Sequence, residues 1–220
     1  LVKQLEAENR KPTQDEKIVL SNFVGWGTLK DVFDESLTKG QMAKAREELK
    51  VLFKVIPGKE SESGEYHWAR QGALAQHFTS PEVVKGIYSI LEHIGFKGGN
   101  VLEPTLGVGN FIGLMPLGMK DSSLWSGAEI DPTAGKIASY LYPEATIKAG
   151  VGFQDAKFQY NQYDLAIGNP PFGDERITDK SPANKAINRF KIHNYIIAKS
   201  AKHLKPGGVM AFVVTNRFLD

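Results

Sequence analysis

The side chains best suited to chemistry in this sequence belong to Asn169-Pro170-Pro171-Phe172, which directly follow an apolar segment. An amino group attached to an aromatic ring is a poor nucleophile, because its lone pair is delocalised into the ring. The side-chain carbonyl of Asn169 and the backbone carbonyl of Pro170 can each accept one hydrogen of such an amine, which aims the lone pair at an electrophile. The two prolines fix the backbone, and Phe172 offers a face for stacking a base. The alternative interpretation is a rigid turn without chemistry.

A glycine-rich turn and an acidic residue form a second candidate site upstream. Gly107 and Gly109 follow a short expected strand, and they allow the backbone to turn sharply and to approach a ligand closely. Glu129 ends the next expected strand, where an acidic residue can accept hydrogen bonds from both hydroxyls of a ribose. The alternatives are a tight connection for the glycine turn and a solvated strand-end charge for Glu129. Asp131-Pro132 is interpreted as a helix N-cap followed by proline in the first turn.

Strands that alternate with helices are expected to position these residues. The pattern predicts strands at about 100–103, 124–130, 145–148, 163–167 and 209–215, with helices between them. This alternation indicates an α/β fold with a mainly parallel sheet. Ligands of such sheets bind beyond the carboxyl ends of the strands, and the glycine turn, Glu129 and Asn169 each come at or directly after a strand end.

The first part of the chain has a different pattern. Residues 1 to about 57 are expected to be helical, and Thr13-Gln14-Asp15-Glu16 has the Thr-x-x-Glu spacing of a capping box. A polar, serine-rich segment at 59–65 is expected to be a linker. We therefore expect two parts, a helical N-terminal extension with its linker at 1–70 and a ligand-binding core at 71–220.

Composition restricts the class of protein. Of the 220 residues, 41% are hydrophobic and 24% are charged, which is typical of a globular protein, and the sequence has no cysteine for a disulfide or a thiolate metal site. Its apolar runs are too short to span a bilayer and its charged start is not a secretory signal, so we expect a cytoplasmic protein without metal. The first residue is not methionine, which predicts a fragment of a longer protein. Because the net charge is only +2, nucleic-acid binding requires a local basic patch.

The strand-end motifs resemble those of the class I S-adenosylmethionine-dependent methyltransferases. The stretch 103–111, Glu-Pro-Thr-Leu-Gly-Val-Gly-Asn-Phe, looks like the amino-methyltransferase form of the first cofactor motif. His-Phe-Thr-Ser-Pro at 77–81 resembles the motif that precedes the first strand in the gamma-type motif order. The resemblance implies a Rossmann-like sheet with helices on both faces and S-adenosylmethionine as cofactor. It also implies seven strands, of which five are counted here, so the C-terminal strands are expected to be missing.

The resemblance assigns roles to single residues. It implies that Glu129 holds the cofactor's ribose, that Ile130 packs on its adenine, and that Thr79 and Ser80 contact its carboxylate. The full set implied for cofactor binding is His77, Phe78, Thr79, Ser80, Glu103, Pro104, Gly107, Gly109, Asn110, Phe111, Glu129, Ile130, Phe153 and Asn169.

This sequence departs from the family pattern in two places. Thr105, Leu106 and Val108 replace the usual residues of the first motif. The usual acidic residue after the third strand is replaced by the stretch 150–155, where Asp155 serves only if the loop is shifted. These departures predict weak cofactor affinity.

The resemblance implies methyl transfer to the exocyclic N6 amine of adenine in DNA, with the base flipped out of a duplex or presented by a single strand. Between residues 173 and 205 eight basic residues stand against three acidic ones, which suits contacts to phosphates. Of these, Lys199, Lys202 and Lys205 are expected on a solvated helix face, and His193 and His203 are expected to be partly buried or on the surface. The eight basic residues are Arg176, Lys180, Lys185, Arg189, Lys191, Lys199, Lys202 and Lys205.

Two alternative functions remain open. Protein glutamine-N5 methyltransferases also use Asn-Pro-Pro-aromatic, although the motif at 78–81 favours DNA. A non-catalytic, methyltransferase-like DNA-binding module of a larger protein is the other alternative. Residues 20–29, Leu-Ser-Asn-Phe-Val-Gly-Trp-Gly-Thr-Leu, resemble the lead-in to the methylase domain of large phage and plasmid proteins that also carry a helicase and are linked to antirestriction. This resemblance implies further domains beyond residue 220.

Overall fold

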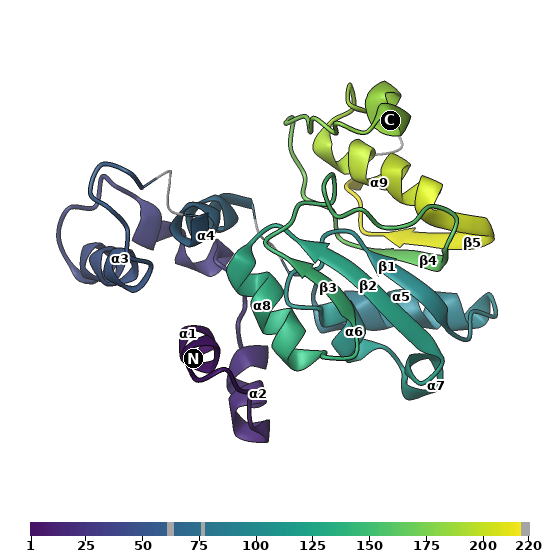
Figure 1. The fold of residues 1–220 in the computed structure, drawn as a ribbon, viewed down its shortest axis with the longest axis horizontal. Helices are drawn as coiled ribbons and strands as arrows, with labels where there is room; N and C mark the ends of the chain where they lie inside the picture. The colour runs from purple at the N-terminus through teal and green to yellow at the C-terminus, as the bar shows by residue number, and fades with distance from the viewer. Residues whose placement is uncertain (61–63, 76–77, 217–220) are drawn as a thin grey trace.

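The computed structural model describes residues 1–60, 64–75 and 78–216. Its centre is a sheet of five parallel strands in the order β3-β2-β1-β4-β5, which confirms the predicted α/β architecture (Figure 1). The strands are β1 (Gly99–Glu103), β2 (Ser123–Glu129), β3 (Thr146–Ala149), β4 (Tyr163–Gly168) and β5 (Leu204–Phe212). All five expected strands are present in the described part of the chain.

The last strand begins earlier than the sequence predicted. β5 starts at Leu204, directly after a helix, whereas strand formation was expected only from Val209. Tyr163 pairs with Leu204 but Leu165 pairs with Val209, so the ladder to β4 is irregular between these two points. Pro206 and Gly207, whose φ is +83°, occupy this bulged start. The regular part of β5 agrees with the prediction.

Helices cover both faces of the sheet, as expected for parallel strands buried on both sides. Successive residues of β1 point to opposite faces, so Val101 packs with Tyr88 and Leu91 of one cluster while Leu102 packs with Tyr195 and Ile196 of the other. The helices of this part are α5 (Pro81–His93), α6 (Asn110–Leu114), α7 (Leu117–Lys120), α8 (Pro132–Leu141) and α9 (Ile192–His203), with the 3-10 segment η2 (Pro182–Ile187).

The N-terminal part is helical, as predicted, and lies beside α8 at the β3 side of the sheet (Figure 1). The capping box is formed, because the Glu16 N–H donates to Thr13 Oγ1 at 3.3 Å and the Thr13 N–H donates to Glu16 Oε2 at 2.8 Å. Leu5 and Leu20 are buried against Ala134 and Ile137 of α8. The elements are α1 (Val2–Glu8), α2 (Gln14–Ser21), the 3-10 segment η1 (Gly27–Phe33), α3 (Gln41–Leu52) and α4 (Gly64–Ala75).

A second small core holds the N-terminal elements together. Trp26 and Phe33 pack with Tyr66, Ala69 and Ala73 of α4. Because α4 continues past residue 70, its buried face belongs to one cluster on both sides of the expected boundary. The division at residue 70 stays a prediction. No helix within the described ranges is long and apolar enough to cross a membrane.

Candidate cofactor and substrate site

Three neighbouring strands bring the predicted site residues to one edge of the sheet. In the strand order β1 lies between β2 and β4, and all three run parallel. Glu103 is the last residue of β1, Glu129 is the last residue of β2, and Asn169 directly follows β4. The carboxyl ends of these strands therefore form a common edge, the position at which open α/β sheets bind ligands.

The turn after β1 requires glycine at two positions. Gly107 has φ +58° and Gly109 has φ +82°, backbone conformations that side chains disfavour. A Cβ atom at Gly107 would lie 2.9 Å from Cε1 of Phe78, and one at Gly109 would lie 2.6 Å from Cε2 of Tyr142. The turn is therefore packed closely by Phe78 and Tyr142, and its glycines cannot be replaced without strain.

Glu129 faces inward instead of forming a solvated strand-end charge. It is only 8% exposed, and its Oε2 accepts the Gly107 N–H at 2.7 Å while its Oε1 accepts the Asp131 N–H at 2.8 Å. Burial raises the pKa of Glu129 to about 7, with a further rise from the charge of Asp131 that the backbone N–H groups oppose. The carboxylate thus ties the glycine turn to the start of α8.

Asp131 has the predicted capping role and one more contact. Its Oδ1 accepts the Thr133 N–H at 2.8 Å, and Pro132 begins α8, as expected for a helix N-terminus. Its Oδ2 accepts a hydrogen bond from Nε1 of Trp26 at 2.8 Å. Sequence reasoning did not connect these residues, because 105 positions separate them.

Glu103 is a buried carboxyl group with an unused oxygen. It is 2% exposed, and its Oε2 has no hydrogen-bond partner among the described residues. Burial, together with the nearby charge of Glu129, raises the pKa of Glu103 well above its ordinary value. A buried acidic group without a partner is costly. A ligand carrying a cationic or N–H donor group at this edge would satisfy it, so Glu103 fits the amino end of the implied cofactor.

Asn169-Pro170-Pro171-Phe172 leaves the sheet beside the glycine turn. The hydroxyl of Thr105 donates to the backbone carbonyl of Asn169 at 3.3 Å, which links the loops after β1 and β4. Phe172 is 42% exposed, and its ring lies 6.1 Å from that of His193 on α9. Thr105 was recognised in the sequence only as a departure from the family pattern, so its role in joining the two loops was missed.

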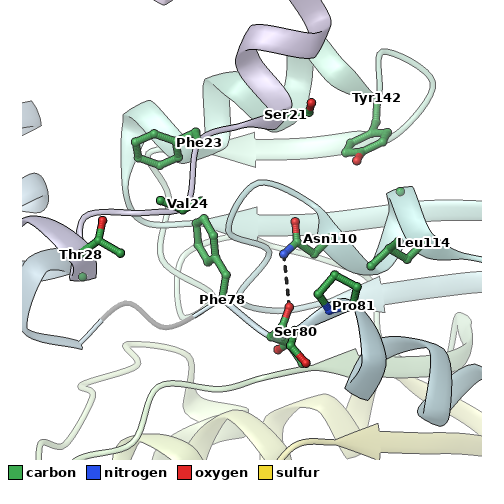
Figure 2. Close-up of a pocket in the computed structure, with 13 residues that line it drawn as sticks. Ser21, Phe23, Val24, Thr28, Phe78, Ser80, Pro81, Asn110, Leu114 and Tyr142 are labelled. Carbon is green, nitrogen blue, oxygen red and sulfur yellow. Dashed lines mark hydrogen bonds between the residues drawn. The ribbon is translucent and has the colours of Figure 1, made fainter.

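The residues before α5 line a hollow of about 670 Å³ beside the glycine turn (Figure 2). Asn110 Nδ2 donates to the Thr79 carbonyl at 3.4 Å across it. The structure thus joins Phe78, Thr79, Ser80 and Asn110 with the N-terminal extension, whereas Glu129, Ile130 and Asn169 lie outside this lining. The lining consists of Ser21, Phe23, Val24, Gly27, Thr28, Phe78, Thr79, Ser80, Pro81, Asn110, Gly113, Leu114 and Tyr142.

The remaining predicted cofactor residues occupy different environments. Phe111 is 2% exposed in the main core, and its carbonyl accepts the Tyr88 hydroxyl at 2.6 Å. Phe153 is also buried, with its ring 5.5 Å from that of His203, whereas Ile130 is exposed. Pro104 is buried, and His77 lies outside the described residues. A cofactor contact from these residues stays a prediction.

The prediction that Lys199 lies on a solvated helix face is wrong. This side chain is buried, and its Nζ donates to Asp179 Oδ2 at 2.9 Å and to the carbonyls of Phe153 and Gln154 at 2.9 and 3.0 Å. Although burial opposes ionisation of Asp179, hydrogen bonds from Lys199 and Tyr195 lower its pKa to about 2. The error arose because helical position alone does not show that Asp179 folds back beneath α9.

Lys202 and Lys205 also have partners. Lys205 pairs with Asp164 at 2.9 Å, and Lys202 donates to the Ala183 carbonyl and to Asn184 Oδ1. His203 is fully buried, while His193 is partly buried as expected. The exposed basic residues of the segment are Arg176, Lys180, Lys185, Arg189 and Lys191. The last of these pairs with Asp174 at 2.6 Å.

Comparison with known proteins agrees with this geometry. Residues 126–220 match the family model of the Eco57I restriction-modification methylases. Over these residues the chain is similar to restriction-modification methylases. It is 30% identical over 145 residues to the type II methyltransferase M.CvrRI of Paramecium bursaria Chlorella virus XZ-6E, which covers 65% of this chain and 37% of that protein. It is 29% identical over 147 residues to the defense against restriction protein B of Escherichia phage P1, covering 65% of this chain and 6% of that protein.

A solved structure supports the fold of this chain. The methyltransferase subunit of a type I restriction-modification system from Streptococcus thermophilus superposes with a TM-score of 0.51 at 16% identity, covering 78% of this chain and 42% of that one. The Rossmann-like methyltransferase fold and the predicted resemblance to a phage antirestriction protein are thereby confirmed. The Streptococcus thermophilus subunit and M.CvrRI are both methyltransferases by name, which agrees with S-adenosylmethionine as the expected cofactor. The chain spans between 6% and 37% of the length of the curated relatives it matches.

Proposed function

We propose that this chain transfers a methyl group from S-adenosylmethionine to the N6 amine of adenine in DNA. The observation that carries the proposal is the position of Asn169-Pro170-Pro171-Phe172, which leaves the end of β4 beside the glycine turn after β1. Two carbonyl acceptors and an exposed aromatic ring thus lie next to the edge where the cofactor is expected. The names of the relatives, which concern restriction and its modification enzymes, favour DNA as the substrate over protein.

The cofactor is proposed to lie across the ends of β1 and β2. Glu103 would accept from its amino group with the oxygen that has no partner among the described residues. Glu129 would accept from the ribose hydroxyls, because each carboxylate oxygen can accept a second hydrogen bond beside the backbone N–H it already binds. Thr79 and Ser80 precede the N-terminus of α5, which attracts a carboxylate. When bound, the cofactor supplies an activated methyl group on a sulfonium.

The protein's own contribution to the reaction is positioning. The side-chain carbonyl of Asn169 and the backbone carbonyl of Pro170 would each accept one hydrogen of the adenine amine, so that its lone pair points at the methyl group. Phe172 would stack on the base, and its exposed ring leaves a face free for this contact. The Thr105 hydroxyl donates to the backbone carbonyl of Asn169, which helps to hold the backbone of this segment in place. No strong base is required before attack, because the proton can leave after the bond forms.

DNA binding is proposed to use the loop between β4 and α9. Adenine inside a duplex cannot reach the sheet edge, so the base must be flipped out or already single-stranded. The exposed cations of this loop are available for phosphate contacts. Asp179 and Lys199 anchor this loop to α9, the helix whose His193 ring lies 6.1 Å from that of Phe172. Further domains of a longer protein, such as a helicase, stay a prediction.

The test measures transfer of labelled methyl groups from S-adenosylmethionine to DNA and to protein acceptors. We expect label in DNA, and we expect Asn169→Ala to lose it. Leu124→Ala is the matched control, because Leu124 is 72% exposed at the opposite part of β2 and should leave transfer unchanged. Label in glutamine side chains of protein would establish the alternative methyltransferase class. Cofactor binding without transfer to either acceptor would favour a non-catalytic module.

A further inference from the structure

The indole group of Trp26 links the N-terminal extension to the segment that follows β2. Trp26 is 6% exposed and lies between α2 and η1. Its Nε1–H donates to Asp131 Oδ2 at 2.8 Å, and this hydrogen bond is buried. The indole ring also packs against Phe33 and Phe53, with ring centroids 6.2 and 6.1 Å away. The ring of Trp26 is therefore held by the extension, while its side-chain N–H binds Asp131 of the core.

Asp131 links Trp26 to Glu129 through two hydrogen bonds. Its two carboxylate oxygens bind Trp26 and the N-terminus of α8, which fixes the side chain at both ends. The N–H of the same residue donates to Glu129 Oε1 at 2.8 Å. The position of the Asp131 backbone thus sets one of the hydrogen bonds that orient the Glu129 carboxylate.

The hydrogen bond from Gly107 to Glu129 is supported from the same extension. Phe23 lies 5.3 Å from Trp26 and 6.2 Å from Phe78, measured between ring centroids. Phe78 in turn packs against the Gly107 turn, whose N–H donates to Glu129 Oε2 at 2.7 Å. Phe23 and Phe78 also line the hollow beside this turn (Figure 2). The Asp131 and Gly107 donors to Glu129 therefore rest on aromatic residues that the N-terminal extension supplies or contacts.

We propose that Trp26 is a positioning residue of the cofactor site, which holds Glu129 through Asp131 in the orientation that recognises the ribose hydroxyls. The inference rests on the proposed function, because it takes Glu129 as the ribose acceptor. The inference goes beyond the proposed function because it gives the N-terminal extension a role in recognising the cofactor. If the extension only stabilised the core, its loss would weaken the binding of every ligand of that core equally. Positioning of Glu129 instead affects only the binding of ligands that carry the ribose hydroxyls.

Two buried tryptophans allow a matched comparison. Trp26→Phe keeps the aromatic packing and removes the N–H donor. Trp125→Phe makes the same chemical change in β2 at a residue that is also 6% exposed, but whose Nε1 has no partner among the described residues. The affinities of both variants and of the unchanged chain are measured for S-adenosylhomocysteine and for its 2′-deoxy analogue. Near-ultraviolet circular dichroism checks that each protein is folded.

Positioning of Glu129 predicts a specific pattern. Trp26→Phe should weaken binding of S-adenosylhomocysteine about tenfold and bind the 2′-deoxy analogue almost as before, so that the preference for the ribose hydroxyl shrinks. Trp125→Phe should keep both affinities. An unchanged preference in folded Trp26→Phe would overturn the inference, as would equal weakening for both ligands. If the unchanged chain binds neither ligand, the proposed function fails, and the inference fails with it.

A second variant keeps the test decisive if Trp26→Phe does not fold. Asp131→Asn can still cap α8 through Oδ1, but its amide nitrogen would face the Trp26 N–H where an acceptor is needed. We expect the same selective loss of ribose preference. Full retention of that preference in folded Asp131→Asn would contradict the role of Trp26.

Discussion

At the scale of single residues, the site combines two buried carboxyl groups with a turn that tolerates only glycine. Glu103 and Glu129 end adjacent strands, and the charge of Glu129 raises the cost of ionising Glu103. Both groups are buried at the carboxyl ends of their strands, which places hydrogen-bond acceptors at the sheet edge. Carboxyl groups with perturbed pKa values are frequent in ligand sites.

The raised pKa of Glu129 predicts a dependence of stability on pH. Its pKa is about 7 in the folded chain and near 4.5 in the unfolded chain, so the folded state holds the proton more tightly. Stability from this group is present below about pH 4.5 and is lost as the pH rises through 7, by up to roughly 3 kcal/mol. Urea unfolding at pH 5 and pH 8 should show this loss, and Glu129→Gln should reduce it. An equal pH dependence in Glu129→Gln would refute the assignment.

The same ionisation predicts tighter cofactor binding at higher pH. A carboxylate is a stronger acceptor for ribose hydroxyls than a protonated carboxyl group. The affinity for S-adenosylhomocysteine, measured by calorimetry, should therefore rise between pH 6 and pH 8. In Glu129→Gln the affinity should be lower and nearly independent of pH over this range. Loss of affinity with rising pH in the unchanged chain would be inconsistent with Glu129 as the ribose acceptor.

Replacement of glycine by alanine should have opposite effects on stability in the turn after β1 and in the middle of α5. Gly109→Ala should destabilise the chain by about 1–3 kcal/mol, because its φ is +82° and the new Cβ would meet Tyr142. Gly86→Ala, in the middle of α5 with open space around it, should stabilise by about 1 kcal/mol. Thermal unfolding of both variants gives the comparison. A harmless Gly109→Ala would mean that the turn adopts another conformation.

At the scale of elements, α9 anchors the loop that follows Asn169-Pro170-Pro171-Phe172. Asp179 in this loop accepts from Tyr195 at 2.5 Å and from Lys199 at 2.9 Å, both on α9. Lys199 also binds two carbonyls of the loop after β3. One buried ion pair therefore joins the loops after β3 and β4 to a helix on the sheet.

Removal of one partner of this pair should be costly. Lys199→Met leaves the Asp179 charge buried without its cation, and we expect a loss of about 3–5 kcal/mol in the free energy of unfolding. Lys44→Met, which breaks the exposed pair with Glu48, should change it by less than about 0.5 kcal/mol. Adding Asp179→Asn to Lys199→Met should recover part of the loss. Similar small effects in both single variants would show that the pair is not buried.

At the scale of the whole molecule, the sequence predicted the order of elements better than the contacts between them. Strand ends and turns were predictable because glycine, proline and apolar runs have local effects on the backbone. The burial of the Lys199 side chain was not predictable, because it depends on an ion pair with Asp179 in the loop before α9. The Trp26 contact with Asp131 was missed for the same reason, since no local pattern links an extension to a strand end. For the site, the residue types were predicted, whereas their hydrogen-bond partners required the fold.

The most direct measurement of the central claim is nucleoside analysis of DNA after incubation with the chain and S-adenosylmethionine. The DNA is digested to nucleosides, which are separated and identified by mass spectrometry. The account predicts N6-methyladenine with the unchanged chain, and a loss of at least about a hundredfold with Asn169→Ala, because positioning of the amine is the protein's main contribution. Methylation on cytosine instead of adenine, or N6-methyladenine formed equally well by Asn169→Ala, would contradict it.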